Sequence, residues 1–153
     1  MRQALFNRWQ FDIAGRAALD LFAGSGALGL EALSRGASSA TFVESDPAAR
    51  RAIEENLRKL RYADRATVVA GQLPDALAQA PPGPYGLVFL APPYHSGAGS
   101  LCLGPLRERG LLAPGARVVL EVHAEEPVAP VEGWAPIDDR HYGITRLLFL
   151  EAR

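Results

Sequence analysis

The chain has 153 residues and a net charge of −1 at pH 7, with 48% hydrophobic and 22% charged residues. This composition excludes a disordered chain and a polycation, so a nucleic-acid ligand would need a local basic patch. The length predicts one domain over residues 1–153 that is stable without disulfides. The single cysteine, Cys102, and the lack of signal-peptide or transmembrane patterns lead us to expect a cytoplasmic protein with no membrane partner. We also expect a monomer.

Short apolar runs predict strands that alternate with helices. Strands are expected where these runs end in glycine, proline or polar residues, at residues 17–22, 40–44, 67–70, 87–90 and 117–122. Helices are expected between them, at residues 28–33, from Pro47 onward, at 74–79 and at 101–109. Two further strands, 134–142 and 144–151, flank Gly143. This order predicts a doubly wound α/β sheet, mostly parallel and seven-stranded, with helices on both faces and a C-terminal antiparallel hairpin.

The helix that starts at Pro47 has clear local signals. Asp46 is placed to cap it, and Pro47 suits its first turn. Ile53, Leu57 and Leu60 recur at spacings of four and three, so we expect them on one buried face. Six basic residues lie within this stretch or just after it, namely Arg50, Arg51, Arg58, Lys59, Arg61 and Arg65. These residues form either a solvated helix face or a local patch for phosphates.

A glycine-rich turn follows the first strand. Gly24, Gly26 and Gly29 match the spacing G-x-G-x-x-G between a strand and a helix. Glycine lets the backbone approach a ligand, and the free N–H groups of the helix start can bind it. Glu44 ends the second strand and can accept both ribose hydroxyls of an adenosine. Together these features fit either NAD or S-adenosylmethionine.

Asp20 favours S-adenosylmethionine over NAD. It lies within the first strand, just before the turn, where an acid can pair with a methionine ammonium but would repel a pyrophosphate. Gln72 follows the third strand and can bind the adenine edge. The residues expected to contact the cofactor are Asp20, Phe22, Ala23, Gly24, Ser25, Gly26, Glu44, Ser45 and Gln72. The three histidines are far apart in the sequence, so we expect no metal site.

A second candidate site follows the apolar strand at 87–90. Ala91-Pro92-Pro93-Tyr94 has two prolines that stiffen the backbone and lack N–H groups, which leaves nearby carbonyls to bind other donors. The amine of a substrate is such a donor. Tyr94 offers an aromatic face on which a base can stack. We therefore expect these four residues to form the catalytic loop.

With these motifs the chain resembles the RsmD-like family of bacterial small-subunit rRNA guanine-N2 methyltransferases. The matching segments are residues 4–7, 19–37, 42–44, 56–57, 88–94 and 142–143, together with the last strand. The resemblance covers nearly the whole chain. It implies a Rossmann-like class I methyltransferase fold, S-adenosyl-L-methionine as cofactor, and transfer of its methyl group to the exocyclic N2 of a guanine. The implied partner is 16S rRNA or a small-subunit assembly intermediate.

Two departures from the family pattern leave alternatives open. Ala91 stands where the family usually has Asp, and the family's basic N-terminal segment is largely absent. The chain could methylate another amine, in adenine, a protein glutamine or a small molecule. It could also be a catalytically weak cofactor-binding module for ribosome assembly. A NAD-dependent oxidoreductase is a further alternative, against which Asp20 counts.

Overall fold

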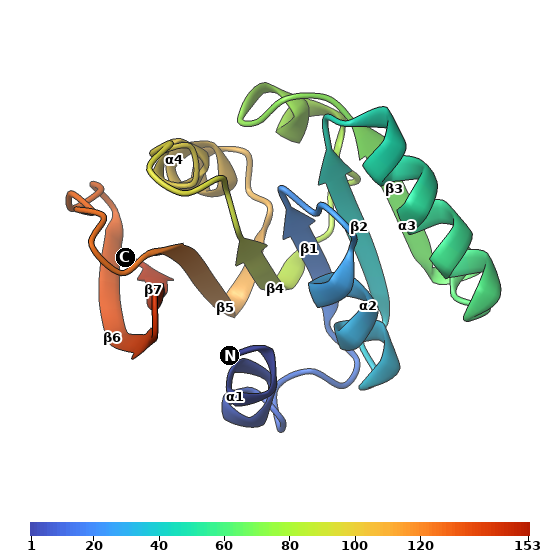
Figure 1. The fold of residues 1–153 in the computed structure, drawn as a ribbon, viewed down its shortest axis with the longest axis horizontal. Helices are drawn as coiled ribbons and strands as arrows, with labels where there is room; N and C mark the ends of the chain where they lie inside the picture. Colours follow the sequence, from blue (N-terminus) through green and yellow to red (C-terminus); the bar gives the residue numbers. More distant parts are fainter.

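A single seven-stranded sheet runs through the computed structural model, which describes residues 1–153 (Figure 1). Its strands are β1 Ala17–Leu21, β2 Ser39–Glu44, β3 Ala66–Ala70, β4 Tyr85–Leu90, β5 Leu112–His123, β6 Trp134–Tyr142 and β7 Thr145–Ala152. They lie in the order β3-β2-β1-β4-β5-β7-β6. The five strands β1 to β5 are mutually parallel, and β7 is antiparallel to both β5 and β6. The predicted mostly parallel sheet with a C-terminal hairpin is therefore confirmed.

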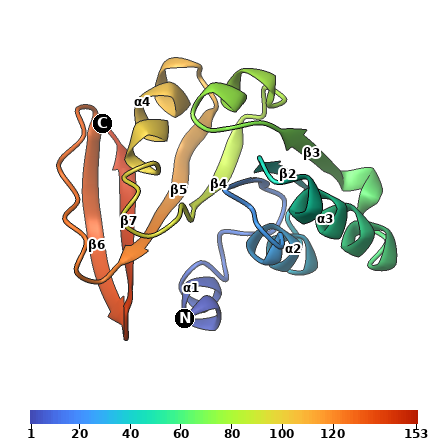
Figure 2. The same ribbon diagram turned by 45° about the horizontal axis from the view of Figure 1, so that its top comes forward.

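Helices cover both faces of this sheet. The helical elements are α1 Arg2–Arg8, α2 Ala27–Ser34, α3 Pro47–Lys59 and α4 Ser100–Glu108, with two short 3₁₀ segments, η1 Ala63–Arg65 and η2 Asp75–Gln79. In Figure 2, α4 lies on one side of the sheet, and α1 and α2 lie on the other. None of these helices has the length and apolar character needed to span a bilayer.

The core divides into two apolar clusters, one on each face of the sheet. One cluster joins the strands to η2 and α4, and the other joins them to α1, α2 and α3. All six residues of β4 are buried, as its uninterrupted apolar run predicts for a central parallel strand. The α3 cap is also as predicted, because Asp46 Oδ2 accepts a hydrogen bond from Ala49 N at 3.2 Å. Local patterns thus specify the framework that carries the site.

Three predicted boundaries or positions are wrong. Leu60 is 52% exposed rather than buried, because α3 ends at Lys59 and Leu60 only caps it. Strand β5 starts at Leu112, five residues before the predicted start, since Leu112 pairs with Tyr85 ahead of a bulge. The helix expected at 74–79 is the 3₁₀ segment η2.

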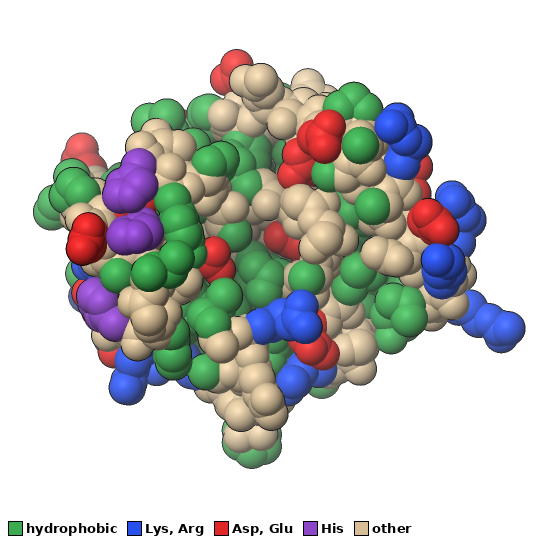
Figure 3. All heavy atoms as spheres, in the orientation of Figure 1, with side chains coloured by type: hydrophobic (Ala, Val, Ile, Leu, Met, Phe, Trp, Pro, Cys, Tyr) green, Lys and Arg blue, Asp and Glu red, His purple; other side chains and the backbone are tan.

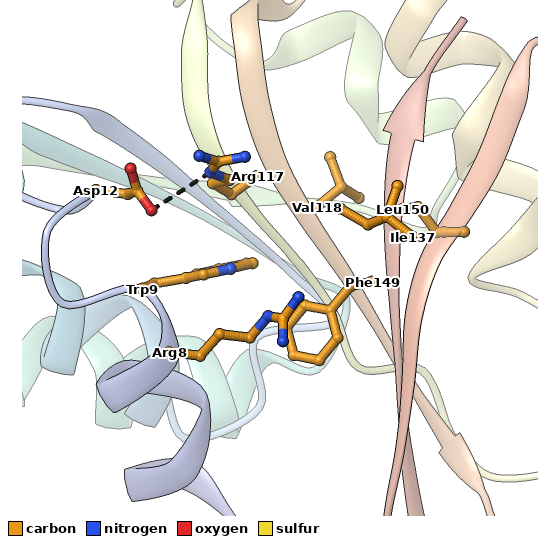
Figure 4. A pocket seen from close by; sticks show the side chains of 8 residues that line it. All are labelled: Arg8, Trp9, Asp12, Arg117, Val118, Ile137, Phe149 and Leu150. Atoms are coloured by element: carbon orange, nitrogen blue, oxygen red, sulfur yellow. Dashed lines mark ion pairs between the residues drawn. The ribbon is translucent and has the colours of Figure 1, made fainter.

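Helix α1 was not predicted, and it packs across β4 and β7. The Trp9 ring, just after α1, lies 5.6 Å from the Phe89 ring and 6.0 Å from the Phe149 ring. A cavity of about 360 Å³ opens beside this contact (Figure 4). At the cavity the Arg8 guanidinium lies 4.2 Å from the centre of the Phe149 ring, and Asp12 pairs with Arg117 at 3.4 Å. The N-terminal segment therefore packs against β4 and β7 through Trp9 and Arg8.

Candidate cofactor and acceptor site

The carboxyl ends of β1 to β4 meet at one edge of the sheet, because the four strands are parallel. A cavity of about 230 Å³ opens there. Its lining residues are Phe22, Val43, Glu44, Ser45, Gly71, Gln72, Leu73, Pro93, Ser96 and Ala98. It therefore lies at the place where a doubly wound sheet binds its ligands.

The Glu44 carboxylate is fixed between two backbone N–H groups. Its Oε1 accepts from Gly24 N at 2.7 Å, and its Oε2 accepts from Asp46 N at 2.8 Å. One bond ties the end of β2 to the glycine turn, and the other ties it to the start of α3. A carboxylate has about four acceptor sites, so two remain for the hydroxyls of a ligand.

The glycines of the turn have different roles. Gly24 has φ +57°, and a Cβ added to it would meet no atom nearer than 4.0 Å. A Cβ on Gly26 would lie 3.1 Å from an Ile53 side-chain carbon, and one on Gly29 would overlap the Phe42 ring. Gly24 therefore keeps its surroundings open for a ligand, whereas Gly26 and Gly29 allow α2 to pack closely on β2 and α3.

Asp20 lies beneath the turn as a buried carboxyl group. Its Oδ2 accepts from Gly29 N at 2.9 Å, inside the first turn of α2. Its Oδ1 accepts no hydrogen bond within the chain, and the residue as a whole is 1% exposed. Desolvation by burial raises the pKa of Asp20 to about 7, the Gly29 N–H lowers it, and the negative charge of Glu44 raises it. A cation bound beside Asp20 would favour its ionised form and so lower this pKa.

The acceptor loop, defined as residues 91–96, follows β4 directly beside the glycine turn. Ala91 N donates to Leu21 O at 3.4 Å, which joins the ends of β4 and β1. The Pro92 carbonyl accepts no hydrogen bond from the chain. Tyr94 is 37% exposed, and its hydroxyl is 2.8 Å from the Thr145 hydroxyl oxygen. A carbonyl without a hydrogen-bond partner and a partly exposed ring therefore lie at the carboxyl end of β4, beside the glycine turn.

The structure brings five of the thirteen predicted site residues to one cavity. Phe22, Glu44, Ser45 and Gln72 line the same cavity as Pro93. The sequence pointed to these residues because each lies at or near the end of a predicted strand. The backbone of Ala23 joins the same edge, because Ala23 N donates to Val43 O at 3.1 Å.

Other residues behave differently from the expectation. Ser25 is exposed and lines a separate surface hollow with Arg2 and Asn56, outside the main cavity. Leu73, Ser96 and Ala98 line the cavity but were not predicted. Gly71, which directly follows β3, is the residue in the sequence that could have drawn attention to Leu73.

These residues fit an adenosine-bearing cation. Glu44 can accept from a ribose and Gln72 can bind a purine edge, since both line the cavity. Asp20 does not line the cavity, but it keeps one carboxyl oxygen without a partner beneath the glycine turn, where it can accept from an ammonium group. A pyrophosphate at the glycine turn, by contrast, would lie close to the Asp20 carboxyl group, which repels it when ionised.

The comparisons with known proteins agree with this geometry. The sequence profile of one family, described as "Conserved hypothetical protein 95", matches residues 1–151. The chain belongs to this family. This membership confirms the resemblance that the sequence predicts. The seven-stranded, mostly parallel sheet with its antiparallel C-terminal hairpin confirms the predicted class I methyltransferase fold.

Relatives of the chain carry informative names. It is 34% identical to the ribosomal RNA small subunit methyltransferase D of Haemophilus influenzae, over 94% of this chain and 76% of that protein. It is 39% identical to the protein of the same name from Escherichia coli, over 86% of this chain and 65% of that protein. The chain thus spans about two thirds to three quarters of the length of these relatives.

A solved structure shows the same fold. A conserved hypothetical protein of Streptococcus pyogenes superposes with a TM-score of 0.88 at 30% sequence identity. The match covers 98% of this chain and 94% of that one.

Proposed function

We propose that this chain is an S-adenosylmethionine-dependent methyltransferase that methylates the exocyclic N2 amine of a guanine in 16S rRNA. The observation that carries the proposal is the pair of carboxyl groups, Asp20 and Glu44, around an open glycine turn. S-adenosylmethionine is a sulfonium with an ammonium group, so this edge suits it better than a pyrophosphate cofactor. The names of the two relatives support the same class of reaction.

The cofactor would supply an electrophilic methyl group, and the acceptor loop would bind the amine that receives it. The lone pair of an exocyclic amine is delocalised into its ring, and acceptors on the N–H bonds help to localise it. The Pro92 carbonyl is free to be one such acceptor. The methylated nitrogen is strongly acidic, so no strong general base is required.

Ala91 removes the second acceptor that the family usually has. Its methyl side chain can bind no N–H, so the loop offers the Pro92 carbonyl and no side-chain oxygen at this position. We therefore expect slower turnover than in an enzyme with Asp there. This residue is also what favours a second candidate function, a weakly active cofactor-binding module for ribosome assembly.

The RNA partner would need local positive charge, because the net charge is −1. Lys and Arg side chains gather over α3 on the face shown in Figure 3. Arg51, Arg58 and Arg61 are exposed there and take part in no ion pair. These side chains can contact phosphates, and a duplexed target base would have to be unstacked to reach the cofactor.

Two measurements test the proposal. Calorimetry should detect binding of S-adenosylhomocysteine and no binding of NAD. Small-subunit particles that lack N2-methylguanine should then gain labelled methyl groups, and nucleoside mass spectrometry should identify N2-methylguanosine. Labelled adenine, protein or small molecules would support the other amine acceptors. Binding of S-adenosylhomocysteine without any turnover would support the assembly module.

A further inference from the structure

Contacts from three directions hold the acceptor loop. Within the loop, the Ser96 hydroxyl donates to the Pro93 carbonyl at 2.6 Å. From β7, Thr145 holds the Tyr94 hydroxyl at 2.8 Å. From the turn after β5, Glu126 Oε1 accepts a hydrogen bond from His95 N at 2.6 Å. The loop is thus tied to two elements that follow it by 31 residues or more.

Glu126 is a buried carboxylate without a cation. It is 7% exposed and takes part in no ion pair. Its Oε1 also lies 3.4 Å from His123 N, and its own N–H donates to the His123 carbonyl at 2.9 Å. A buried charge is unfavourable unless hydrogen bonds compensate for it, and here backbone N–H groups supply them. The carboxylate therefore acts as an anchor for backbone rather than as part of an ion pair.

The bond to Glu126 holds His95 in a conformation that it would not adopt readily by itself. His95 has φ +61°, in the left-handed region that non-glycine residues rarely occupy. Such residues persist when their surroundings fix them. Because His95 comes directly after Tyr94, its conformation decides the direction in which the loop leaves the acceptor position.

The same anchor fixes the side chains around Tyr94. The His95 and His123 rings lie 4.8 Å apart, and the His123 ring meets the Tyr94 ring edge-on at 5.4 Å. All three histidines of the chain lie on the same side of the molecule in Figure 3. Glu126 binds the backbone of both His95 and His123, so it sets the relative position of this ring group.

We propose that Glu126 is a positioning residue for methyl transfer. Its carboxylate holds the His95 N–H, which keeps the Pro92 carbonyl and the Tyr94 ring in place for the acceptor base. This role rests on the proposed methyltransferase function, and Glu126 itself need not touch the substrate or the cofactor. The role is distinct from folding stability, because the residue acts on the geometry of one loop.

Three variants of the full chain test this role. Glu126→Ala removes the acceptor, Glu126→Gln keeps an oxygen that can bind His95 N–H, and Glu125→Gln is a control at an exposed neighbour. Amide exchange by NMR reports the His95 N–H without any need for activity. Calorimetry with S-adenosylhomocysteine reports the cofactor edge, and steady-state methylation gives kcat and KM separately.

We expect Glu126→Ala to lower kcat by about 10- to 100-fold, as displacement of a reacting group does. Affinity for S-adenosylhomocysteine should fall by less than kcat does, because Glu126 lies outside the cofactor cavity and only Pro93 and Ser96 of the loop line it. Glu126→Gln should recover kcat to within about 3-fold of the wild type, since a neutral acceptor is weaker but still present. Glu125→Gln should behave as the wild type.

The exchange measurement separates this proposal from the proposed function. The His95 amide should exchange at least about 10-fold faster in Glu126→Ala and slowly in Glu126→Gln. Unchanged exchange in Glu126→Ala, or an unchanged kcat in an active enzyme, would overturn the positioning role. A wild type that binds S-adenosylhomocysteine but methylates nothing would reject the proposed function alone, and faster exchange would then still support Glu126 as the anchor of the loop.

Discussion

At the scale of single residues, Asp20 links the site to pH. Burial raises its pKa to about 7 in the folded chain, from an ordinary value of 3.8. The folded state therefore holds this proton more tightly than the unfolded state. The contribution of Asp20 to stability is largest below about pH 4 and is lost as the pH rises towards 7.

The same linkage predicts how cofactor binding depends on pH. If the ionised carboxylate pairs with an ammonium group, affinity for S-adenosylhomocysteine should rise about tenfold per pH unit below 7 and level off above it. Asp20→Asn keeps an oxygen for Gly29 N–H but removes the charge, so its affinity should be lower and independent of pH. Calorimetry from pH 5.5 to 8.5 measures both proteins. A pH-independent wild type would show that Asp20 does not bind the ammonium.

Ala91 makes a second prediction at this scale. Ala91→Asp restores an acceptor beside the free Pro92 carbonyl, so methyl transfer should rise by up to about 100-fold, similar to the effect of one oxyanion-hole donor. Ala91→Val adds bulk without an acceptor and serves as the matched control. Initial rates at saturating cofactor give the comparison. If Ala91→Asp is no faster than the wild type, the absent acceptor does not limit turnover.

At the scale of elements, the packing of α2 on β2 depends on Gly29. An added Cβ would lie 2.8 Å from Phe42 Cζ, within a rigid ring. Alanine favours a helix over glycine by about 1 kcal/mol, whereas overpacking costs about 1–3 kcal/mol. We therefore expect Gly29→Ala to lower the free energy of unfolding by up to about 2 kcal/mol in urea titrations.

The Phe42 ring provides the control for that prediction. Phe42→Leu removes the ring, so Gly29→Ala should be neutral or stabilising in the Phe42→Leu background. An equal loss of stability in both backgrounds would mean that the ring is not the cause. The cycle therefore separates the contact from the helix propensity of alanine.

At the scale of the whole molecule, α1 closes the apolar face over β4 and β7. Trp9 is 3% exposed and contacts Phe89 and Phe149. Trp9→Ala should lower the free energy of unfolding by about 3–5 kcal/mol, as truncation of a buried aromatic side chain does. The affinity for S-adenosylhomocysteine should be unchanged under conditions where the variant is folded, because the cofactor cavity lies elsewhere.

Phe11 is the matched control for this segment. It is 90% exposed, so Phe11→Ala should change stability by less than about 0.5 kcal/mol. A large effect of Phe11→Ala, or a small effect of Trp9→Ala, would contradict the observed docking of the N-terminal segment. Urea denaturation of both variants makes this comparison.

Much of the framework was predictable because it depends on local patterns. Apolar runs, glycine and proline positions, and the Asp46 cap predicted all seven strands and the cover on both faces of the sheet. The ends of successive parallel strands must meet at one edge, so Glu44 and Gln72 could be assigned to one site before their contacts were known.

Contacts between residues far apart in sequence could not be predicted in this way. The exposure of Leu60, the outward position of Ser25 and the docking of α1 depend on neighbours that no local period encodes. The bond between Glu126 and His95 joins positions 31 residues apart across two loops. The sequence by itself therefore determined the sheet and the edge proposed for the cofactor. Only the tertiary structure decided how the acceptor loop is held, because that depends on a side chain from a distant turn.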